Sequence, residues 1–333
     1  MIEAMRGYAA KNALRLHTPG HKGSLCDIDV TELSDGSFPA DEIASVQKTA
    51  AELYGAKHCV LLCCGSSQGV KSAIYHAACN GIADVNSHRS VFDGFKLSAK
   101  KCVTVRRRGV RPITVEDIKG ALTSDIGAVV VTSPTYYGYC ADIDGIARFC
   151  RSNGLLFIVD GAHGAHFGAN KHLPPSFAGD CDICNLSAHK TLDALTQSAM
   201  LFSNLPDAEH KKLVEVTELM GTTSPSYLLY ASLEHAIRSL KRTGGAYEAL
   251  FDPISEVKRR YGFEENDDFT RLVLDCRKLC KDSSELNAAL MRNGVASELD
   301  DGERLVFIFT AADTPQSVQR FDCALGRALK EII

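Results

Sequence analysis

The sequence predicts an α/β fold in which a mostly parallel, seven-stranded sheet is covered by helices and followed by a smaller α+β unit. The first observation is a series of short, continuous apolar runs, which are typical of strands buried on both faces of a sheet. The second is that helical patterns separate the first five runs, as in parallel sheets with helical crossovers. The runs are residues 59–63, 82–86, 102–106, 128–132, 155–160, 183–186 and 198–202, and the helical patterns are residues 67–78, 90–99, 114–122 and 142–151.

The pattern changes after Met220. A long helical segment starts at Pro225, since proline is favoured in the first turn of a helix, and the Gly-Gly pair at Gly244 marks a boundary. We therefore expect an N-terminal segment (residues 1–50), a large domain (residues 51–244) and a small α+β domain (residues 245–333). In the small domain the patterns predict helices over residues 247–260, 284–291 and 314–332, and strands over residues 270–274, 295–298 and 305–309.

The composition argues against nucleic-acid-binding, secreted and membrane proteins. The formal net charge is -4, and the most basic run, residues 106–108, is interpreted as a solvated strand end. The first residues lack the apolar core of a secretory signal. The longest apolar runs, such as residues 155–159, fall short of the about 20 residues that a membrane-spanning helix needs. We expect a soluble, cytoplasmic protein with no nucleic-acid or membrane partner.

The 13 cysteines do not indicate a disulfide scaffold, because their number is odd and the chain is long. Most lie inside apolar runs, where a free cysteine behaves as a small hydrophobic residue. Cys181 and Cys184 have the CxxC spacing, but no second close pair completes a metal-site pattern, since Cys276 and Cys280 are spaced as one helical face. We expect buried, reduced thiols and no metal site.

Lys190 is a candidate nucleophile, because it follows the predicted strand over residues 183–186. Ligands of parallel sheets bind at the carboxyl ends of the strands. A lysine amine with a pKa near ~10.4 is a poor nucleophile at neutral pH, and burial beside other groups activates it toward carbonyl compounds. The alternative is an ordinary surface lysine, so the interpretation depends on its companions.

The first companion is Asp160, at the end of the apolar run LLFIVD. A carboxylate at the tip of a buried strand is costly without a cationic partner. A protonated pyridine nitrogen would be such a partner, and Ala162, two residues on, would point the same way and leave room for a flat ring. The alternative is an aspartate that caps a helix or turn.

Two further strand ends carry suitable groups. Gly65, Ser66 and Ser67 stand between a predicted strand and a helix, where free N–H groups and the helix dipole favour an anion such as phosphate. Serine is also a common N-cap. His88 lies at the next strand-to-helix junction, where its ring would stack on a cofactor or serve a structural role. An amine, an acid, a phosphate-binding loop and a stacking ring together predict an enzyme that binds pyridoxal 5′-phosphate (PLP).

With these motifs in place, the chain resembles the PLP-dependent fold type I decarboxylases of ornithine, lysine and arginine. The matching segments run in the family's order over about the first two thirds of the chain. They are HTPGHKG (17–23), DVTEL (29–33), GSSQ (65–68), SHRS (87–90), SPTYYG (133–138), DGAHGAHFG (160–168), SAHKTLDALTQ (187–197) and TSPSY (223–227).

The resemblance implies the aspartate aminotransferase-like fold and specific roles. Lys190 would form the Schiff base with PLP, Asp160 would pair with the pyridinium, His88 would stack on the ring, and His163 would lie near the ring oxygen or the substrate. The implied cofactor-binding residues are Gly65, Ser66, Ser67, Ala162, Ser187 and His189, with Thr223 and Ser224 reaching the cofactor of a neighbouring subunit. A homodimer with shared active sites, to which residues 1–50 contribute, is therefore expected.

The implied reaction is decarboxylation of lysine, ornithine or arginine to the corresponding amine and CO₂, with a proton returned to Cα by Lys190 or a nearby histidine. Tyr136, in one matching segment, and Arg304, at the start of a predicted strand, are candidate substrate contacts. A pocket for a basic side chain also needs a carboxylate. The candidates for it are Glu32, Asp35, Asp41 and Glu42.

The chain departs from the family pattern in four respects. Residues 160–163 read DGAH where the family has DEAH, and residues 34–39 replace a stretch rich in Leu, Asp and His. A segment like PCPPG in the family's C-terminal region and the response-regulator-like N-terminal wing are missing. We expect a compact form of the family. Two alternatives stay open: another PLP reaction such as transamination, if Arg304 holds the substrate carboxylate, or a degenerate PLP-binding partner of a longer decarboxylase.

Overall fold

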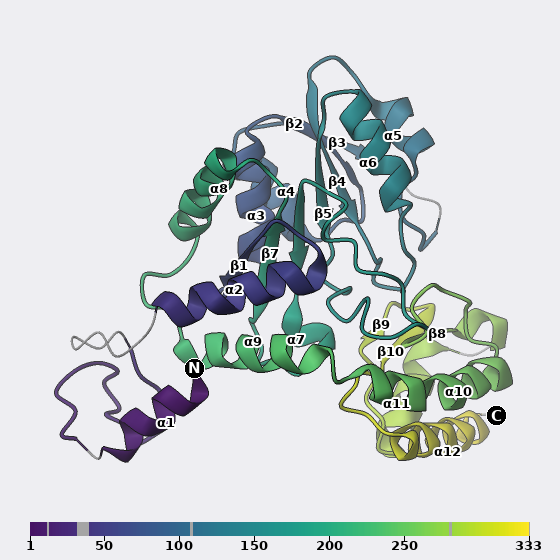
Figure 1. The fold of residues 1–333 in the computed structure, drawn as a ribbon. Helices are drawn as coiled ribbons and strands as arrows, with labels where there is room; N and C mark the ends of the chain where they lie inside the picture. The colour runs from purple at the N-terminus through teal and green to yellow at the C-terminus, as the bar shows by residue number, and fades with distance from the viewer. Residues whose placement is uncertain (12, 32–39, 107–108, 280–281, 333) are drawn as a thin grey trace. The chain divides into compact units, whose positions relative to one another are not determined.

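The computed structural model describes residues 1–11, 13–31, 40–106, 109–279 and 282–332. Contacts divide the chain into two compact units (Figure 1). The first comprises Met1–Ser133, Ala141–Ala165 and Ser176–Ser239, and the second comprises Pro134–Cys140, His166–Pro175 and Leu240–Ile333. The expected division at residues 50/51 and 244/245 stays a prediction, and helix α2 (Ala40–Tyr54) runs across the first of these positions.

The first unit contains a seven-stranded sheet, which confirms the predicted fold. Its strand order is β1-β7-β6-β5-β4-β2-β3, and β7 alone runs antiparallel to its neighbours. The strands are β1 (His58–Leu62), β2 (Asn80–Asp84), β3 (Cys102–Val105), β4 (Ile126–Thr132), β5 (Leu156–Asp160), β6 (Ile183–Leu186) and β7 (Ala199–Ser203). The central strands β4, β5 and β6 are almost wholly buried, as their continuous apolar runs predict.

Helices cover the sheet of the first unit (Figure 1). On one side α3 packs against α4 and α8, and on the other α6 packs against β5 and α5 against β3. Capping side chains start several of these helices: for example, Thr114 forms a capping box with Asp117, and Asp142 accepts from the backbone N–H of Gly145. The helices of the first unit, not all of which lie on the sheet, are α1 (Ile2–Ala10), α2, α3 (Ser66–Ala77), α4 (Arg89–Leu97), α5 (Val115–Ala121), α6 (Ile143–Ser152), α7 (Ala188–Thr191), α8 (Asp207–Leu219) and α9 (Tyr227–Leu240).

The strand directions determine where functional groups gather. Strands β1, β2, β5 and β6 are parallel, so their carboxyl ends lie at one edge of the sheet. The segments that follow these ends are residues 65–67, 88–90, 161–163 and 187–190. Every candidate from the four predicted strand ends therefore belongs to the same edge of the first unit.

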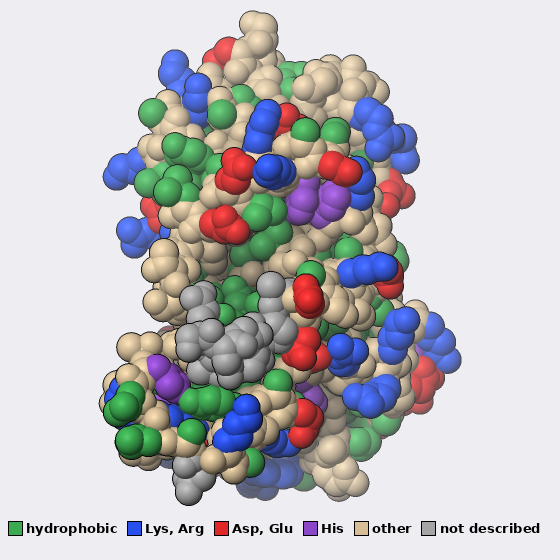
Figure 2. All heavy atoms as spheres, turned by 60° about the vertical axis from the view of Figure 1, so that its left-hand side comes forward, with side chains coloured by type: hydrophobic (Ala, Val, Ile, Leu, Met, Phe, Trp, Pro, Cys, Tyr) green, Lys and Arg blue, Asp and Glu red, His purple; other side chains and the backbone are tan. Residues whose placement is uncertain are grey.

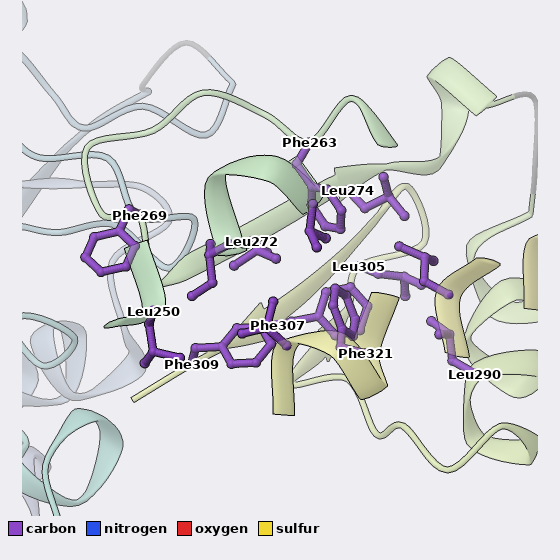
Figure 3. Packing of buried hydrophobic residues seen from close by; sticks show 14 of the residues in the cluster. Leu250, Phe263, Phe269, Leu272, Leu274, Leu290, Leu305, Phe307, Phe309 and Phe321 are labelled. Atoms are coloured by element: carbon purple, nitrogen blue, oxygen red, sulfur yellow. The ribbon is translucent and has the colours of Figure 1, made fainter. Parts of the chain in front are cut away.

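The second unit is an α+β layer around a three-stranded antiparallel sheet of order β8-β10-β9. Phenylalanine and leucine side chains, among them Phe263, Phe307 and Phe321, form its core (Figure 3). Its elements are α10 (Gly244–Tyr261), β8 (Arg271–Asp275), the 3-10 helix η1 (Cys276–Leu279), α11 (Ser283–Arg292), β9 (Leu299–Asp300), β10 (Arg304–Ile308) and α12 (Pro315–Glu331).

The predicted strand over residues 295–298 is wrong, because the strand is Leu299–Asp300. The preceding segment remains attached to α11: Val295 donates its N–H to Leu290, and the Ser297 hydroxyl donates to Asn287 Oδ1. Glu298 is the first residue of this segment to bond to β10: its backbone N–H donates to the Val306 oxygen, with N and O 2.8 Å apart.

No helix in the described part of the chain is both long and apolar enough to cross a membrane. The described cysteines have free thiols, and Cys181 and Cys184 are buried. Burial raises the pKa of the Cys184 thiol well above its usual value, so it is inert as a nucleophile.

Two stacked histidines lie where α8 meets the start of β1. The rings of His58 and His210 are parallel to within 6°, with centroids 4.0 Å apart. The charged or titratable side chains around them are those of Asp207, Lys57 and His76. Figure 2, in which the left-hand side of Figure 1 is turned forward, shows histidine side chains between acidic and basic ones. Burial, followed by the neighbouring His58, lowers the pKa of His210 to about 4.

This pair predicts a loss of stability in acid. Between pH 6.5 and 4 the unfolded chain takes up a proton that folded His210 resists, so the free energy of unfolding falls by about 1–2 kcal/mol after allowance for screening by water. The change His210→Phe keeps a stacked ring and should remove this part of the pH dependence in urea unfolding at pH 7 and 4.5. His172→Phe, at another stacked histidine (3.6 Å from Phe251), is the matched control. An unchanged pH dependence in His210→Phe would contradict the assignment.

Candidate active site

Lys190 lies in the short helix α7, directly after the carboxyl end of β6, and is partly exposed. Its Nζ is 3.0 Å from Nε2 of His163, which is buried in the turn that follows β5. The backbone N–H of His189 donates to the Ser198 oxygen, which ties α7 to the chain entering β7. An amine and an imidazole are thus held within hydrogen-bond reach, the arrangement that proton exchange between them requires.

Asp160 is the last residue of β5 and is 3% exposed. Its Oδ1 accepts one long hydrogen bond, 3.4 Å from the N–H of Ala162. Burial raises the pKa of the Asp160 carboxyl, and the charges of Lys190 and His88 act against that shift. Such a carboxylate, with one weak hydrogen bond from the described residues, is suited to a cationic partner brought in by a ligand.

The loop between β1 and α3 presents backbone donors. Gly65 has φ +79°, a conformation that favours glycine, and α3 begins at Ser66. Gly65, Ser66 and Ser67 are all partly exposed, so the first N–H groups of a 12-residue helix face outward at the edge that carries Lys190. Asn185 of β6 donates from Nδ2 to Ser66 Oγ. We call Gly65, Ser66 and Ser67 the cup.

His88 is the N-cap of α4 and is exposed. Its Nδ1 accepts from the backbone N–H of Ser90 at 3.2 Å and lies 2.8 Å from Ser90 Oγ. A neutral ring that accepts at Nδ1 carries its proton on Nε2. The cap fixes the ring at the end of β2, so the structural and the stacking interpretations of His88 are compatible.

Ser187 supplies the clearest fit to PLP. Its side chain is fully buried, and Oγ has no hydrogen-bond partner among the described residues. A phosphate oxygen would satisfy this hydroxyl together with the donors of the cup. A protonated pyridine nitrogen would pair with Asp160, and the aldehyde would meet the Lys190 amine. These residues therefore fit PLP.

The orphaned hydroxyl predicts effects of opposite sign for Ser187→Ala. Removing a buried, unpaired hydroxyl should raise the free energy of unfolding of the PLP-free protein by about 1 kcal/mol, and losing a donor should weaken PLP binding roughly 5- to 10-fold. Urea unfolding measures the free energy of unfolding, and titration with PLP measures the affinity. Ser203→Ala is the matched control, because that buried serine, at the opposite edge of the sheet, accepts from Leu205 N–H at 3.3 Å. A Ser187→Ala protein that binds PLP normally would contradict this placement.

Two other expectations concern the position of Ala162 and the reach of Thr223 and Ser224 into a neighbouring subunit. Ala162 lies beyond the end of β5, in a turn, so strand alternation does not apply to it, and its expected place against a flat ring stays a prediction. Thr223 and Ser224 are exposed in the segment between α8 and α9, and the Ser224 N–H donates to Thr222 Oγ1. Their expected reach into a neighbouring subunit stays a prediction.

The candidate substrate residues of the second unit already contact acidic groups. The Tyr136 hydroxyl donates to Glu298 Oε1 at 2.6 Å. Arg304 pairs with the carboxylates of Glu264, Asp301 and Glu303. A substrate carboxylate would have to displace one of these, so the structure adds no support for the transaminase alternative.

Two of the four carboxylates considered for substrate selectivity lie in α2. Glu32 and Asp35 fall outside the described residues. Asp41 and Glu42 are in the first turn of α2, and Glu42 Oε2 is 3.2 Å from the amino group of Met1.

Comparison with known proteins identifies the family. Residues 1–255 match the model of the Orn/Lys/Arg decarboxylase major domain. The arginine decarboxylase of Bacillus cereus is 26% identical over 98% of this chain and 81% of its own length. The arginine decarboxylase of Bacillus subtilis is 27% identical over 100% of this chain and 76% of its own length.

Solved structures agree on the fold. The lysine decarboxylase of Francisella novicida superposes with a TM-score of 0.77 at 16% identity, over 97% of this chain, which spans 59% of that protein's chain. The serine palmitoyltransferase of Sphingomonas wittichii gives 0.70 at 21% identity, over 98% of this chain and 84% of its own. The predicted fold type I architecture, decarboxylase class and PLP cofactor are confirmed, and the chain belongs to the ornithine, lysine and arginine decarboxylase family.

Proposed function

We propose that this chain decarboxylates a basic amino acid, with arginine as its first candidate substrate, at the edge of the sheet that carries Lys190. The observation that carries the proposal is the Lys190–His163 pair at 3.0 Å, on the strand end next to buried Asp160. Arginine is preferred to lysine or ornithine because the two Bacillus arginine decarboxylases match over nearly the whole chain.

Each residue has a distinct task in this proposal. When bound, PLP supplies a ring that accepts the electron pair left on Cα as CO₂ departs. The negative charge of Asp160 would keep a proton on the ring nitrogen of bound PLP, because a buried carboxylate strongly favours a cation beside it. The cup and Ser187 would hold the phosphate, and His88 would cover the ring.

Lys190 and His163 handle protons. A proton passed from Lys190 Nζ to His163 Nε2 leaves a neutral amine, which is the nucleophilic form. The same two atoms then form the donor pair from which a proton returns to Cα of the product. Burial of His163 excludes bulk water from one side of this pair.

The proposal extends to assembly and location. A homodimer would cover apolar side chains in the N-terminal segment, where Leu14, Leu16 and Leu25 are each 84% exposed. Thr223 and Ser224, exposed in one chain, would then contribute to the neighbouring subunit's site. We also propose a cytoplasmic location, which the free thiols of the described cysteines support.

The test uses the purified protein loaded with PLP and supplied in turn with L-arginine, L-lysine and L-ornithine. Release of CO₂ in equal amount with the amine product, fastest for arginine, is the expected result. D-Arginine serves as the control for a stereospecific site. CO₂ release from lysine or ornithine alone would mean that one of these amino acids, and not arginine, is the substrate. Formation of a keto acid without CO₂ would overturn the decarboxylase proposal.

A further inference from the structure

Asn185 is a polar side chain in an otherwise apolar strand. It lies in β6 between Cys184 and Leu186 and is 1% exposed. Its backbone oxygen accepts from Gly161 N–H at 2.9 Å, so it also fixes the start of the turn after Asp160. Burying a carboxamide costs free energy unless its groups are hydrogen-bonded, so its contacts indicate what it does.

The carboxamide is held between the cup and α3. Nδ2 donates to Ser66 Oγ. Oδ1 points at Gly69 and has no hydrogen-bond partner among the described residues. A Cβ on residue 69 would lie 2.1 Å from Oδ1, so only glycine leaves room for this position of the side chain. Because Oδ1 lies against Gly69, Nδ2 is the end of the carboxamide that faces Ser66.

The direction of this hydrogen bond determines what Ser66 can offer a ligand. A serine hydroxyl has one hydrogen to donate. Because Asn185 donates to Ser66 Oγ, that hydrogen stays available for an acceptor at the cup. The reverse arrangement would turn the Ser66 hydrogen toward Asn185 Oδ1 and present lone pairs to an anion, which repels it.

We infer that Asn185 is a positioning residue that directs the Ser66 hydroxyl at the cofactor phosphate, with Gly69 making room for it. This inference rests on the proposed phosphate-binding role of the cup. It concerns binding of the phosphate and not the chemistry at Cα.

The test compares PLP with pyridoxal, which lacks the phosphate, by equilibrium titration of PLP-free protein. Asn185→Leu, which keeps the volume, should weaken PLP binding roughly 10-fold and leave pyridoxal binding unchanged. In a Ser66→Ala background the same change should cause no further loss, because Asn185 acts through that hydroxyl. Equal losses for PLP and pyridoxal, or additive losses in the double variant, would overturn the inference.

An isosteric variant covers the case in which Asn185→Leu does not fold. Asn185→Asp can only accept from Ser66 and adds a negative charge, so PLP binding should weaken roughly 100-fold with pyridoxal binding unaffected. Asn153→Asp is the matched control, because Asn153 is exposed and precedes β5 at the opposite edge of the sheet. PLP binding of Asn185→Asp equal to that of Asn153→Asp would also overturn the inference. If the unmodified protein binds PLP no better than pyridoxal, the proposed cup itself fails.

Discussion

Replacing Lys190 by alanine is expected to lower the rate of CO₂ release roughly 10³- to 10⁴-fold. The variant loses the amine that lies 3.0 Å from His163 Nε2 and with it both the nucleophile and one of the two proton donors. The fold should survive, because Lys190 is partly exposed and alanine suits the helix in which it lies. The cup, Ser187 and Asp160 remain, so PLP should still bind, though without a covalent link.

Absorbance spectroscopy separates these effects. PLP bound covalently to a lysine absorbs at visible wavelengths, and this band should vanish in Lys190→Ala while dialysis still shows bound PLP. Lys212→Ala is the matched control, since Lys212 is an exposed lysine of the same unit that pairs with Glu209 on α8. A Lys190→Ala protein that keeps both the band and CO₂ release would assign the chemistry to another lysine.

Most of the fold could be predicted because burial leaves a plain pattern in the sequence. Strands buried on both faces are continuous apolar runs, and each of the seven predicted runs overlaps a strand of the sheet. The direction of β7 could not be predicted, because an apolar run is the same in either direction. Helix α8 escaped prediction for another reason. Only Leu213 and Thr217 are buried in it, so its periodicity is weak.

The grouping of the candidate site residues was predictable where the expected chemistry requires particular residue types at strand ends. Lys190 and His88 follow parallel strands, Asp160 is the last residue of another, and the sheet brings these strand ends to one edge. The contact between Lys190 and His163 depends on the conformations of the short helix α7 and of the turn after β5, which the residue pattern does not specify. Asn185 was missed, although a polar residue in an apolar strand was a usable signal.

Long-range pairing limited the interpretation of Arg304. The residue does open a strand, as predicted, but two of its carboxylate partners, Asp301 and Glu303, lie beside it in the chain and the third, Glu264, comes from 40 positions earlier. A single sequence shows that acidic residues are present and not which of them will meet the guanidinium. The sequence alone therefore allowed Arg304 as a substrate-binding residue, whereas the structure shows its guanidinium paired with carboxylates of the chain.

The change Asp160→Asn should lower the rate of CO₂ release roughly 10²- to 10³-fold, since removing one partner of a buried ion pair costs about 3–5 kcal/mol. Asparagine keeps the shape and the bond from Ala162 but cannot hold a proton on the facing ring nitrogen. The Lys190 amine is untouched, so the visible band of bound PLP should remain. This combination distinguishes Asp160→Asn from Lys190→Ala.

The same change should stabilise the PLP-free protein. The folded-state pKa of Asp160 is raised by burial, so above that pKa the ionised carboxylate destabilises the fold, and this cost is relieved as pH falls through it. Asparagine removes the cost, and the free energy of unfolding at pH 7 should rise by about 1 kcal/mol or more. PLP should then add less stability to the variant than to the unmodified protein.

Thermal unfolding with and without PLP measures both the stability gained from Asp160→Asn and the stability that PLP adds. Asp182→Asn is the matched control, because Asp182 accepts from Phe157 N–H at 2.7 Å at the opposite ends of β5 and β6, a contact that asparagine can keep. If PLP raises the melting temperature of Asp160→Asn as much as that of Asp182→Asn, the carboxylate does not face the ring nitrogen. A smaller rise in Asp160→Asn alone, with a slower reaction, requires that the buried charge of Asp160 be neutralised by the cofactor.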